Sequence, residues 1–364
     1  MTELLTSPIR NLHIAQERLQ ALFNYRKPDR VPLGNQYASL GFNTLRTGGT
    51  ITDAYTDPEM SFKSYIAVCD RYGWDQILQF YCHTLLGALD FGGRIRMPQG
   101  EYEIGVIVTD YPVDSPADVE RLSQPDSQNT GFIPRARRFA ELQRINGLPA
   151  GFLTRSPFAM AANICGIELF LKWAFKAPEL CRHLMQMSLD HIFRVLALWT
   201  EYFGKENIWV QLSTPTESNQ LISPKLFELL ALPYHIQYHK RLKALGIRQF
   251  MLHLCGDQNL NLPIWAECKP WPHPSVLSFG HEVELTKAGE MFPEDIILGN
   301  IDPSFLLTGS PQQVYEHCRK MIEVGRNLPG GFILAPGCDI SPHTPDANLD
   351  SMRQAINDFG VYEH

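Results

Sequence analysis

No run of basic residues occurs in this 364-residue chain, whose formal net charge is −7 and whose isoelectric point is about 5.9. Proteins that bind nucleic acid need clustered lysine and arginine side chains, because these displace the counterions that gather on phosphates. We therefore expect no nucleic-acid partner.

Long apolar stretches are missing as well. No uninterrupted apolar segment approaches the length of about 20 residues that crosses a bilayer. The first residues, MTELLT, lack the basic start and the apolar core of a signal peptide. We expect a cytoplasmic protein that does not contact a membrane.

The eight cysteines lack the regular spacing of a disulfide framework. A chain of this length builds its core without disulfides, and in a reducing compartment the cysteines stay thiols. We expect most of them to be small core residues. They stand at positions 69, 82, 165, 181, 255, 268, 318 and 338.

Hydrophobic residues make up 44% of the chain and charged residues 20%, as in a soluble globular protein. A helical lead-in covers residues 1–30, and the alternation at 93–110 predicts a β-hairpin beside the main sheet. Residues 114–145 are polar, with a helix start at Ser115-Pro116. Further strands are expected at 31–36, 73–80, 148–154, 207–213, 248–254, 275–279, 295–299 and 331–335, with helices between them.

Strands that alternate with helices at this spacing form parallel βα units. About eight such strands favour a closed (β/α)8 TIM barrel, an α/β fold, as one domain over residues 1–364. A doubly wound open sheet is the alternative. In both folds the functional residues lie at the carboxyl ends of the strands.

His253 and Cys255 stand at the end of the strand at 248–254, directly before Gly256. Residues two apart on a strand point to the same side, so these two side chains can bind one metal ion. Imidazole and thiolate suit zinc, and a catalytic zinc site typically has three protein ligands. Cys338, which follows the strand at 331–335, is the best third ligand. Cys268 is its main competitor, although its surroundings predict a helix end.

Two further polar features are ambiguous. Glu217 follows the strand at 207–213 and is a candidate fourth ligand or general base, or else a solvated loop carboxylate. His235 and His239 lie four residues apart on one helix, a spacing that metal sites use, but surface or packing roles are favoured for them.

Several motifs occur in a fixed order along the chain. The His253/Cys255 pair is followed by GNIDP at 299–303 and by PGCDI at 336–340. Together with earlier segments at 27–32 and 221–227, they resemble the methyltransferase branch of the uroporphyrinogen decarboxylase superfamily over nearly the whole chain.

The resemblance implies a barrel enzyme with zinc bound by His253, Cys255 and Cys338, which exchanges a methyl group with a corrinoid (cobalamin) carried by a partner protein. A homodimer is a candidate assembly of this chain. Members usually have an acidic residue near position 281, so His281 is either a substrate-specific catalytic residue or a loop residue.

Zinc could hold an acceptor thiol as thiolate, or it could stabilise the oxygen that leaves a methyl ether. Demethylation of a methoxylated aromatic onto the corrinoid is preferred, because aromatic residues are expected near the site. Methylation of a thiol resembling coenzyme M is the alternative. Porphyrinogen decarboxylation ranks below both, because this chain lacks the arginine-rich N-terminal segment of the decarboxylases. A scaffold without turnover is the remaining possibility. The aromatic residues are Tyr37, Phe42, Phe80, Tyr81, Phe158, Trp209 and Phe279.

Overall fold

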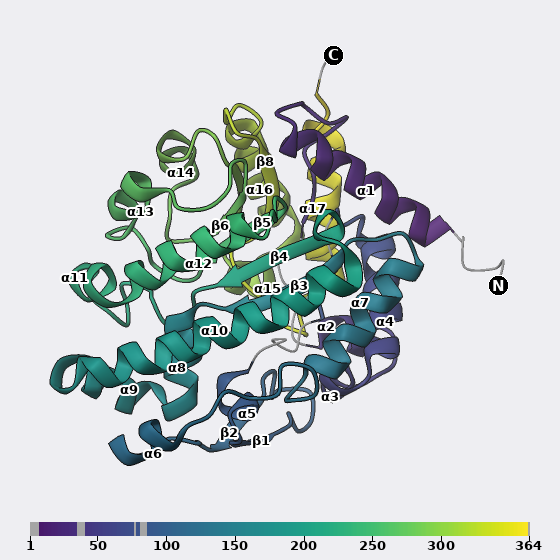
Figure 1. Cartoon of the computed structure of the whole chain (residues 1–364). Coiled ribbons are helices and arrows are strands. Elements are labelled where there is room, and N and C mark those ends of the chain that lie inside the picture. The colour runs from purple at the N-terminus through teal and green to yellow at the C-terminus, as the bar shows by residue number, and fades with distance from the viewer. Residues whose placement is uncertain (1–6, 35–40, 76–77, 81–85, 363–364) are drawn as a thin grey trace.

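Six parallel strands form the central sheet of the computed structural model, which describes residues 7–34, 41–75, 78–80 and 86–362. Neighbouring strands in the sheet follow one another in sequence, and helices connect them on the outside (Figure 1). The strands are β3 Ala150–Arg155, β4 Ile208–Ser213, β5 Phe250–Leu254, β6 Val276–Phe279, β7 Ile296–Ile301 and β8 Phe332–Pro336. All six were predicted from the sequence, to within a few residues at each end.

Two segments from the N-terminal part of the chain extend this sheet toward a closed barrel. Leu33 forms a parallel bridge with Leu334 of β8, and the amide of Gly34 donates to Leu334 O at 2.8 Å. The amide of Asp75 in turn donates to Leu33 O at 2.6 Å. The expected strands at 31–36 and 73–80 therefore appear only as isolated pairings in the described residues, and 35–36 and 76–77 lie outside them.

A glutamine connects the second of these segments to β3. The side chain of Gln143 donates to Leu78 O at 2.8 Å and accepts from the amide of Gly151 at 2.9 Å. Both edges of the six-stranded sheet thus meet the N-terminal segments. The expected TIM barrel is confirmed, and the described residues of the two N-terminal segments meet the sheet through isolated pairings.

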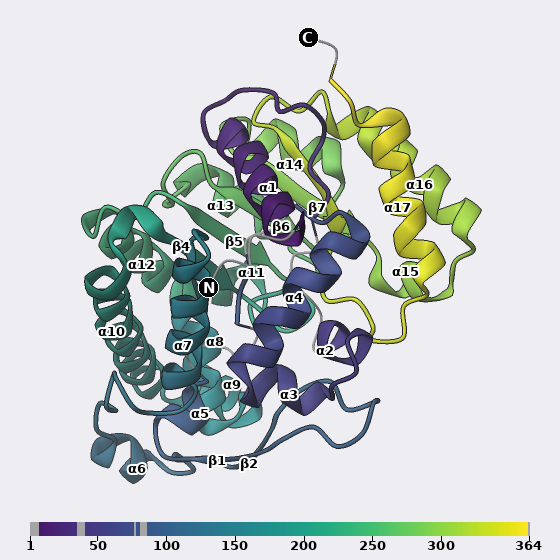
Figure 2. The same ribbon diagram turned by 90° about the vertical axis from the view of Figure 1, so that its right-hand side faces the viewer.

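Helices surround the barrel. Figure 2 shows α10 and α12 on one side, α16 and α17 on the other, and α1 and α4 toward the viewer. The helices before β3 are α1 Ser7–Phe23, α2 Phe42–Arg46, α3 Ile51–Thr56, α4 Pro58–Tyr72, α5 Gly87–Asp90, α6 Pro116–Arg121 and α7 Ile133–Ile145. Those after β3 are α8 Pro157–Cys165, α9 Ile167–Lys176, α10 Pro178–Phe203, η1 Lys205–Asn207, α11 Pro224–Leu226, η2 Phe227–Ala231, α12 Leu232–Ala244, α13 Leu262–Cys268, α14 Leu285–Met291, α15 Pro303–Thr308, α16 Pro311–Gly325 and α17 Asp346–Phe359.

The expected hairpin is present as the antiparallel strands β1 Arg94–Arg96 and β2 Ile107–Asp110. Helix α7 differs from the expectation of a polar segment at 114–145. Its buried residues include Ile133, Ala136 and Phe139, which recur at helical spacing. Four arginines among its 13 residues make the segment polar as a whole and hide this pattern in the sequence.

Alternate residues of each strand point into the barrel. Trp209, Met251 and Val276 belong to one buried cluster together with Leu19 and Leu22 of α1, so α1 packs against the amino-terminal end of the barrel. Residues of opposite parity point outward to the helices. Phe152 of β3, for example, packs edge-to-face on Trp199 of α10, with 5.5 Å between ring centroids.

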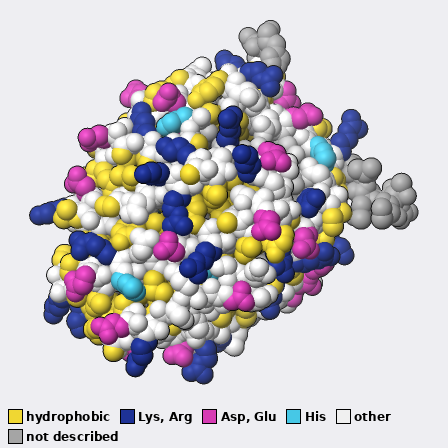
Figure 3. Space-filling view, in the orientation of Figure 1, with side chains coloured by type: hydrophobic (Ala, Val, Ile, Leu, Met, Phe, Trp, Pro, Cys, Tyr) yellow, Lys and Arg dark blue, Asp and Glu magenta, His cyan; other side chains and the backbone are white. Residues whose placement is uncertain are grey.

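The outer surface carries both signs of charge. On the face shown in Figure 3, Lys and Arg side chains are interspersed with Asp and Glu, and hydrophobic side chains lie between them. Among the described residues, no single helix is long and apolar enough to span a membrane. The pair α8 and α9 passes that test only together and is bent by 107° between the two helices.

A buried carboxylate joins the elements that close the barrel. Asp75, 3% exposed, forms ion pairs of 2.8 Å with Arg18 of α1 and with Arg30, and it also accepts from the amide of Leu33 at 3.0 Å. Because both arginines are mostly buried as well, loss of the carboxylate leaves two cations without their shared partner.

We predict that Asp75→Ala lowers the free energy of unfolding by about 3 kcal/mol in urea titrations. The matched control is Asp350→Ala, which breaks the pair of Asp350 with Arg71. That pair is 43% and 49% exposed, and its loss is expected to change stability by less than about 1 kcal/mol. Equal effects of the two substitutions would contradict the role given to Asp75.

Candidate metal centre

The end of β5 directs two candidate ligands into the barrel mouth. His253 has the same parity as the inward-facing Met251, and Cys255 follows the last strand residue. The chain then turns at Gly256, whose φ is +66°, and a Cβ at this position would lie 2.8 Å from the side-chain oxygen of Gln220. Glycine is therefore required for this turn so close to Cys255.

The third candidate ligand arrives from β8. Cys338 follows Gly337, and a Cβ on Gly337 would lie 2.9 Å from the amide nitrogen of His281. This close approach of two loops brings Cys338 to the mouth. The ligand atoms of His253, Cys255 and Cys338 all lie within 4.8 Å of one another, the one such group of His, Cys, Asp or Glu among the described residues.

The imidazole of His253 is oriented from β6. Its Nδ1 lies 3.1 Å from Ser278 Oγ, and its Nε2 lies 3.9 Å from Cys338 Sγ. When Nδ1 carries the proton and donates it to Ser278, the lone pair of Nε2 faces the two sulfurs. A partner of this kind commonly fixes the tautomer of a metal-binding histidine.

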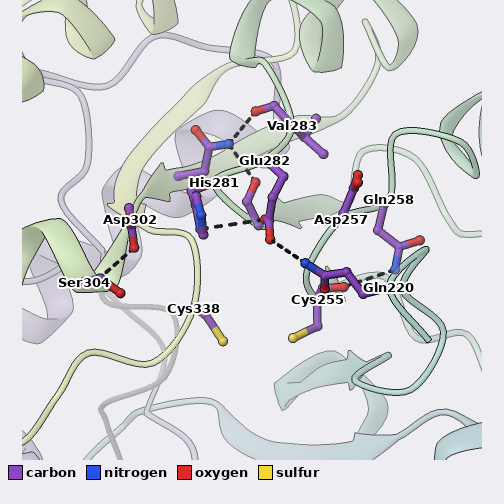
Figure 4. Close-up of polar contacts among 12 residues, drawn as sticks. Gln220, Cys255, Asp257, Gln258, His281, Glu282, Val283, Asp302, Ser304 and Cys338 are labelled. Carbon is purple, nitrogen blue, oxygen red and sulfur yellow. Dashed lines mark hydrogen bonds and ion pairs between the residues drawn. The ribbon is translucent and has the colours of Figure 1, made fainter.

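The two thiols influence each other. The hydrogen bond from Cys338 lowers the pKa of the Cys255 thiol, because it stabilises the Cys255 thiolate. The same contact raises the pKa of Cys338 to about 12, and burial adds to this rise. Figure 4 shows both sulfurs pointing into the same space. Without a cation, Cys255 is therefore the more acidic thiol of the pair.

These donors fit zinc. One imidazole and two thiols are ligand types that zinc prefers, and three protein ligands leave a position open for a substrate. In a tetrahedral site, a bound nitrogen and a bound sulfur are separated by about 3.6 Å. The 3.9 Å between His253 Nε2 and Cys338 Sγ needs only a small adjustment. Zinc at this site stays a prediction.

Cys268, the competing ligand, is the last residue of α13, and its Sγ lies 3.7 Å from Trp265 O. The helix end predicted there is confirmed. Cys268 does not belong to the group formed by His253, Cys255 and Cys338.

We predict about one zinc per chain in the native protein, measured by elemental analysis after growth with ample zinc. The variants Cys338→Ser and His253→Ala are expected to lose it, because two ligands hold zinc much more weakly than three. Cys268→Ser is the matched control and should keep its zinc. Full zinc content in Cys338→Ser would remove that residue from the site.

Glu217 is buried, with 0% exposure, so the alternative of a solvated loop carboxylate is wrong. One carboxylate oxygen accepts from Ser156 Oγ at 3.0 Å, and the other lies 2.9 Å from His235 Nε2. Glu217 thereby links the end of β3, the loop after β4 and α12. It is not part of the metal-ligand group, and its proposed role as ligand or base stays a prediction.

Because both oxygens of Glu217 have protein partners, we expect Glu217→Gln to lower the free energy of unfolding by about 1 to 3 kcal/mol. Zinc affinity should stay within about twofold of the native value, whereas loss of a true ligand costs far more. Chemical unfolding and competition with a chelator measure the two quantities. A large loss of zinc affinity without loss of stability would make Glu217 a ligand.

His281 lies at the rim of the candidate site. Its side chain is 46% exposed, and its Nδ1 is 3.7 Å from Glu282 Oε2. Glu282 in turn accepts from the side-chain amide of Gln220 at 3.4 Å (Figure 4). The side chain of Asn300 holds this loop by donating to Gly280 O and Val283 O. A catalytic role for His281 stays a prediction.

Of the surface and packing roles favoured for His235 and His239, burial excludes the surface role. His235 and His239 are 1% and 0% exposed. His239 packs edge-to-face on Phe250, with 5.0 Å between ring centroids. Desolvation lowers the pKa of His239 well below its ordinary value, so it stays neutral.

The five described members of the aromatic set expected around the mouth belong to the core. Phe42, Phe80, Phe158, Trp209 and Phe279 are buried in hydrophobic clusters. Trp209 lies near the opposite end of the barrel, where it packs on Phe23 with 5.5 Å between ring centroids. Tyr37 and Tyr81 lie outside the described residues.

The sequence interpretation missed the contacts of Ser278 and Glu282. Ser278 is the one polar residue in the short strand β6, at a position whose parity points inward. A buried polar residue in an apolar strand could have indicated its role. Glu282 follows the end of β6, but nothing local distinguishes it from other loop carboxylates.

The fold and the His-Cys-Cys group together define a TIM-barrel protein with a candidate metal centre at the carboxyl ends of its strands. Residues 15–359 match the model of the family described as uroporphyrinogen decarboxylase (URO-D). The chain belongs to this family.

The chain is similar to methylcobamide:CoM methyltransferase MtaA of Methanosarcina barkeri, with 25% identity over 94% of this chain and 97% of the relative. A methylated-thiol–coenzyme M methyltransferase of Methanosarcina mazei is 29% identical over 69% of this chain and 66% of the relative. A uroporphyrinogen decarboxylase of Staphylococcus haemolyticus is 22% identical over 87% of this chain and 89% of the relative.

A solved structure described as a methyltransferase from Methanosarcina mazei has the same fold, with a TM-score of 0.79. It is 23% identical and covers 95% of this chain and 98% of its own. The relatives in sequence confirm the resemblance to the methyltransferase branch, and the chain is an enzyme of the methyltransferase type.

Proposed function

We propose that this enzyme transfers a methyl group between a corrinoid, presented by a partner protein, and a small thiol at a zinc centre formed by His253, Cys255 and Cys338. The observation that carries the proposal is the grouping of these three ligand atoms within 4.8 Å at the mouth of the barrel. The names of the relatives support both the corrinoid and the thiol.

When bound, zinc supplies a Lewis acid that lowers the pKa of a thiol and so keeps the acceptor nucleophilic at neutral pH. The remaining chemistry falls to the protein. Cys255 and Cys338 would hold the metal as thiolates, and Ser278 keeps the Nε2 lone pair of His253 directed at the site.

In the transfer, the thiolate sulfur forms a bond to the methyl carbon while the carbon–cobalt bond breaks, and the electron pair of that bond stays on cobalt. The proton of the incoming thiol must leave first. Glu282 and His281 stand at the rim and can pass this proton to solvent. The apolar residues deeper in the barrel exclude water from below the site.

Demethylation of a methoxylated aromatic is the second candidate. The sequence favoured it because aromatic residues were expected at the mouth, but the described members of that set are buried in the clusters of the core. The described aromatic residues do not supply that support, and the names of the relatives give the thiol acceptor first place. The decarboxylase relatives leave porphyrinogen decarboxylation as a further outcome of the test.

We predict that the zinc-loaded enzyme transfers methyl groups from methylcobalamin to 2-mercaptoethanesulfonate. Absorbance follows the loss of methylcobalamin, and mass spectrometry detects the methyl thioether. Cys338→Ser should lower the rate at least about a hundredfold, because it removes a ligand that holds the metal for thiol activation. Cys268→Ser should retain it.

The same assay run with reduced cobalamin and methoxybenzoates distinguishes the second candidate. Formation of methylcobalamin from a methoxybenzoate, with no methylation of any thiol, would replace the thiol proposal by demethylation. Loss of carboxyl groups from uroporphyrinogen, with no methyl transfer in either direction, would favour the decarboxylase.

A further inference from the structure

Arg155 is unusual among the residues of the barrel strands. It is the one Lys, Arg, Asp or Glu in β3 to β8, all six of which lie within the described residues. It ends β3, its side chain is half-buried, and its Nε atom is shielded from solvent. Guanidinium groups at such positions commonly recognise carboxylate or other oxyanion groups, which match their planar set of donors.

The register of the strands places Arg155 in the same row as the metal-ligand group. Arg155 pairs with Ser213 of β4, and Ser213 pairs with His253 of β5. Paired residues of adjacent parallel strands project to the same side of a sheet. His253 and its own pair Ser278 illustrate this, since their side chains touch inside the mouth.

The parity of β3 gives the same direction. Phe152 faces outward onto Trp199 of α10, so Arg155, three residues later, faces inward. Two strand spacings separate Arg155 from His253, which corresponds to about 10 Å between the backbones. Because an arginine side chain is long, the distance left between its guanidinium group and His253 corresponds to the length of a small molecule.

Carboxylates are frequent in the loops that follow the strands. Each of the strands β5 to β8 is followed within three residues by a carboxylate, namely Asp257, Glu282, Asp302 and Asp339. Figure 4 draws three of these, Asp257, Glu282 and Asp302, above the two sulfurs. Glu217, four residues after β4, already has Ser156 and His235 at its two oxygens. Arg155 is the one cation that β3 to β8 themselves carry to their carboxyl ends. The carboxylates repel an anionic substrate group, and the guanidinium attracts it.

We propose that Arg155 binds an anionic group, a carboxylate or sulfonate, at the far end of the small substrate and thereby directs its reacting end to His253, Cys255 and Cys338. The inference rests on the proposed function, because it places the reacting atom at the candidate metal centre. It adds a positioning residue for the anionic end of the substrate, which none of the three metal-ligand candidates supplies.

The test compares probes of similar size that differ in charge. One pair is 2-mercaptoethanesulfonate and 2-mercaptoethanol, and the other is 4-methoxybenzoate and 4-methoxybenzyl alcohol. Their binding to the zinc-loaded enzyme is measured by calorimetry, which needs no turnover. We expect the anionic member of at least one pair to bind about ten to a hundred times more tightly, as for a charge-assisted hydrogen bond.

Three variants locate the origin of that preference. Arg155→Gln should reduce it to less than about threefold, while Arg155→Lys, which keeps the charge but not the planar donors, should retain part of it. Lys225→Gln is the matched control, since Lys225 is an exposed cation at the start of α11. It should keep the full preference, because exposed charges are largely screened by salt.

Equal binding of the charged and neutral members of both pairs by the native enzyme would overturn the proposal, even if Arg155→Gln failed to fold. An unchanged preference in a folded Arg155→Gln variant would overturn it as well. Methylation of both thiols with equal kcat/KM would remove the role of Arg155 and leave methyl transfer intact. A retained charge preference without any methyl transfer would keep the role of Arg155 and contradict the proposed methyl transfer.

Discussion

The register of the parallel strands is the constraint on which the candidate site depends. It places Arg155, Ser213, His253 and Ser278 in one row that faces the barrel mouth. A slip of one residue in β5 would turn His253 out toward the helices and would separate it from Ser278. The inward apolar cluster below this row is closed by α1. It fixes the register, because the same slip would turn its strand side chains to the outer face of the sheet.

The loops after the strands complete what the register begins. Gly256 and Gly337 allow Cys255 and Cys338 to approach the row of strand residues, and Asn300 holds the loop that carries His281 and Glu282. The mouth consequently has two unlike sides. Soft ligands with carboxylates nearby lie after β5 to β8. At the end of β3 lies the cation Arg155, and the carboxylate Glu217 beside it is already bound by Ser156 and His235. This asymmetry suits a small substrate with one nucleophilic end and one anionic end.

Some parts of the structure could not be predicted because several local patterns look alike in sequence. The strands are apolar on both faces, as in other parallel sheets, so the sequence did not distinguish the inward Trp209 from the outward Phe279. The aromatic set was assigned to the mouth for that reason. Glu217 looked like a loop carboxylate, since its partners Ser156 and His235 come from β3 and α12, elements distant in sequence.

The sequence alone determined the alternation of strands and helices, and it determined that His253 and Cys255 share one side of a strand end. These properties are local, since they depend on the spacing of neighbouring residues and on the residue types themselves. Tertiary structure decided that Cys338 and not Cys268 joins them. Closure of the barrel brings Cys338 to within 3.9 Å of His253 across 85 positions of the chain, whereas Cys268 ends a helix outside the barrel.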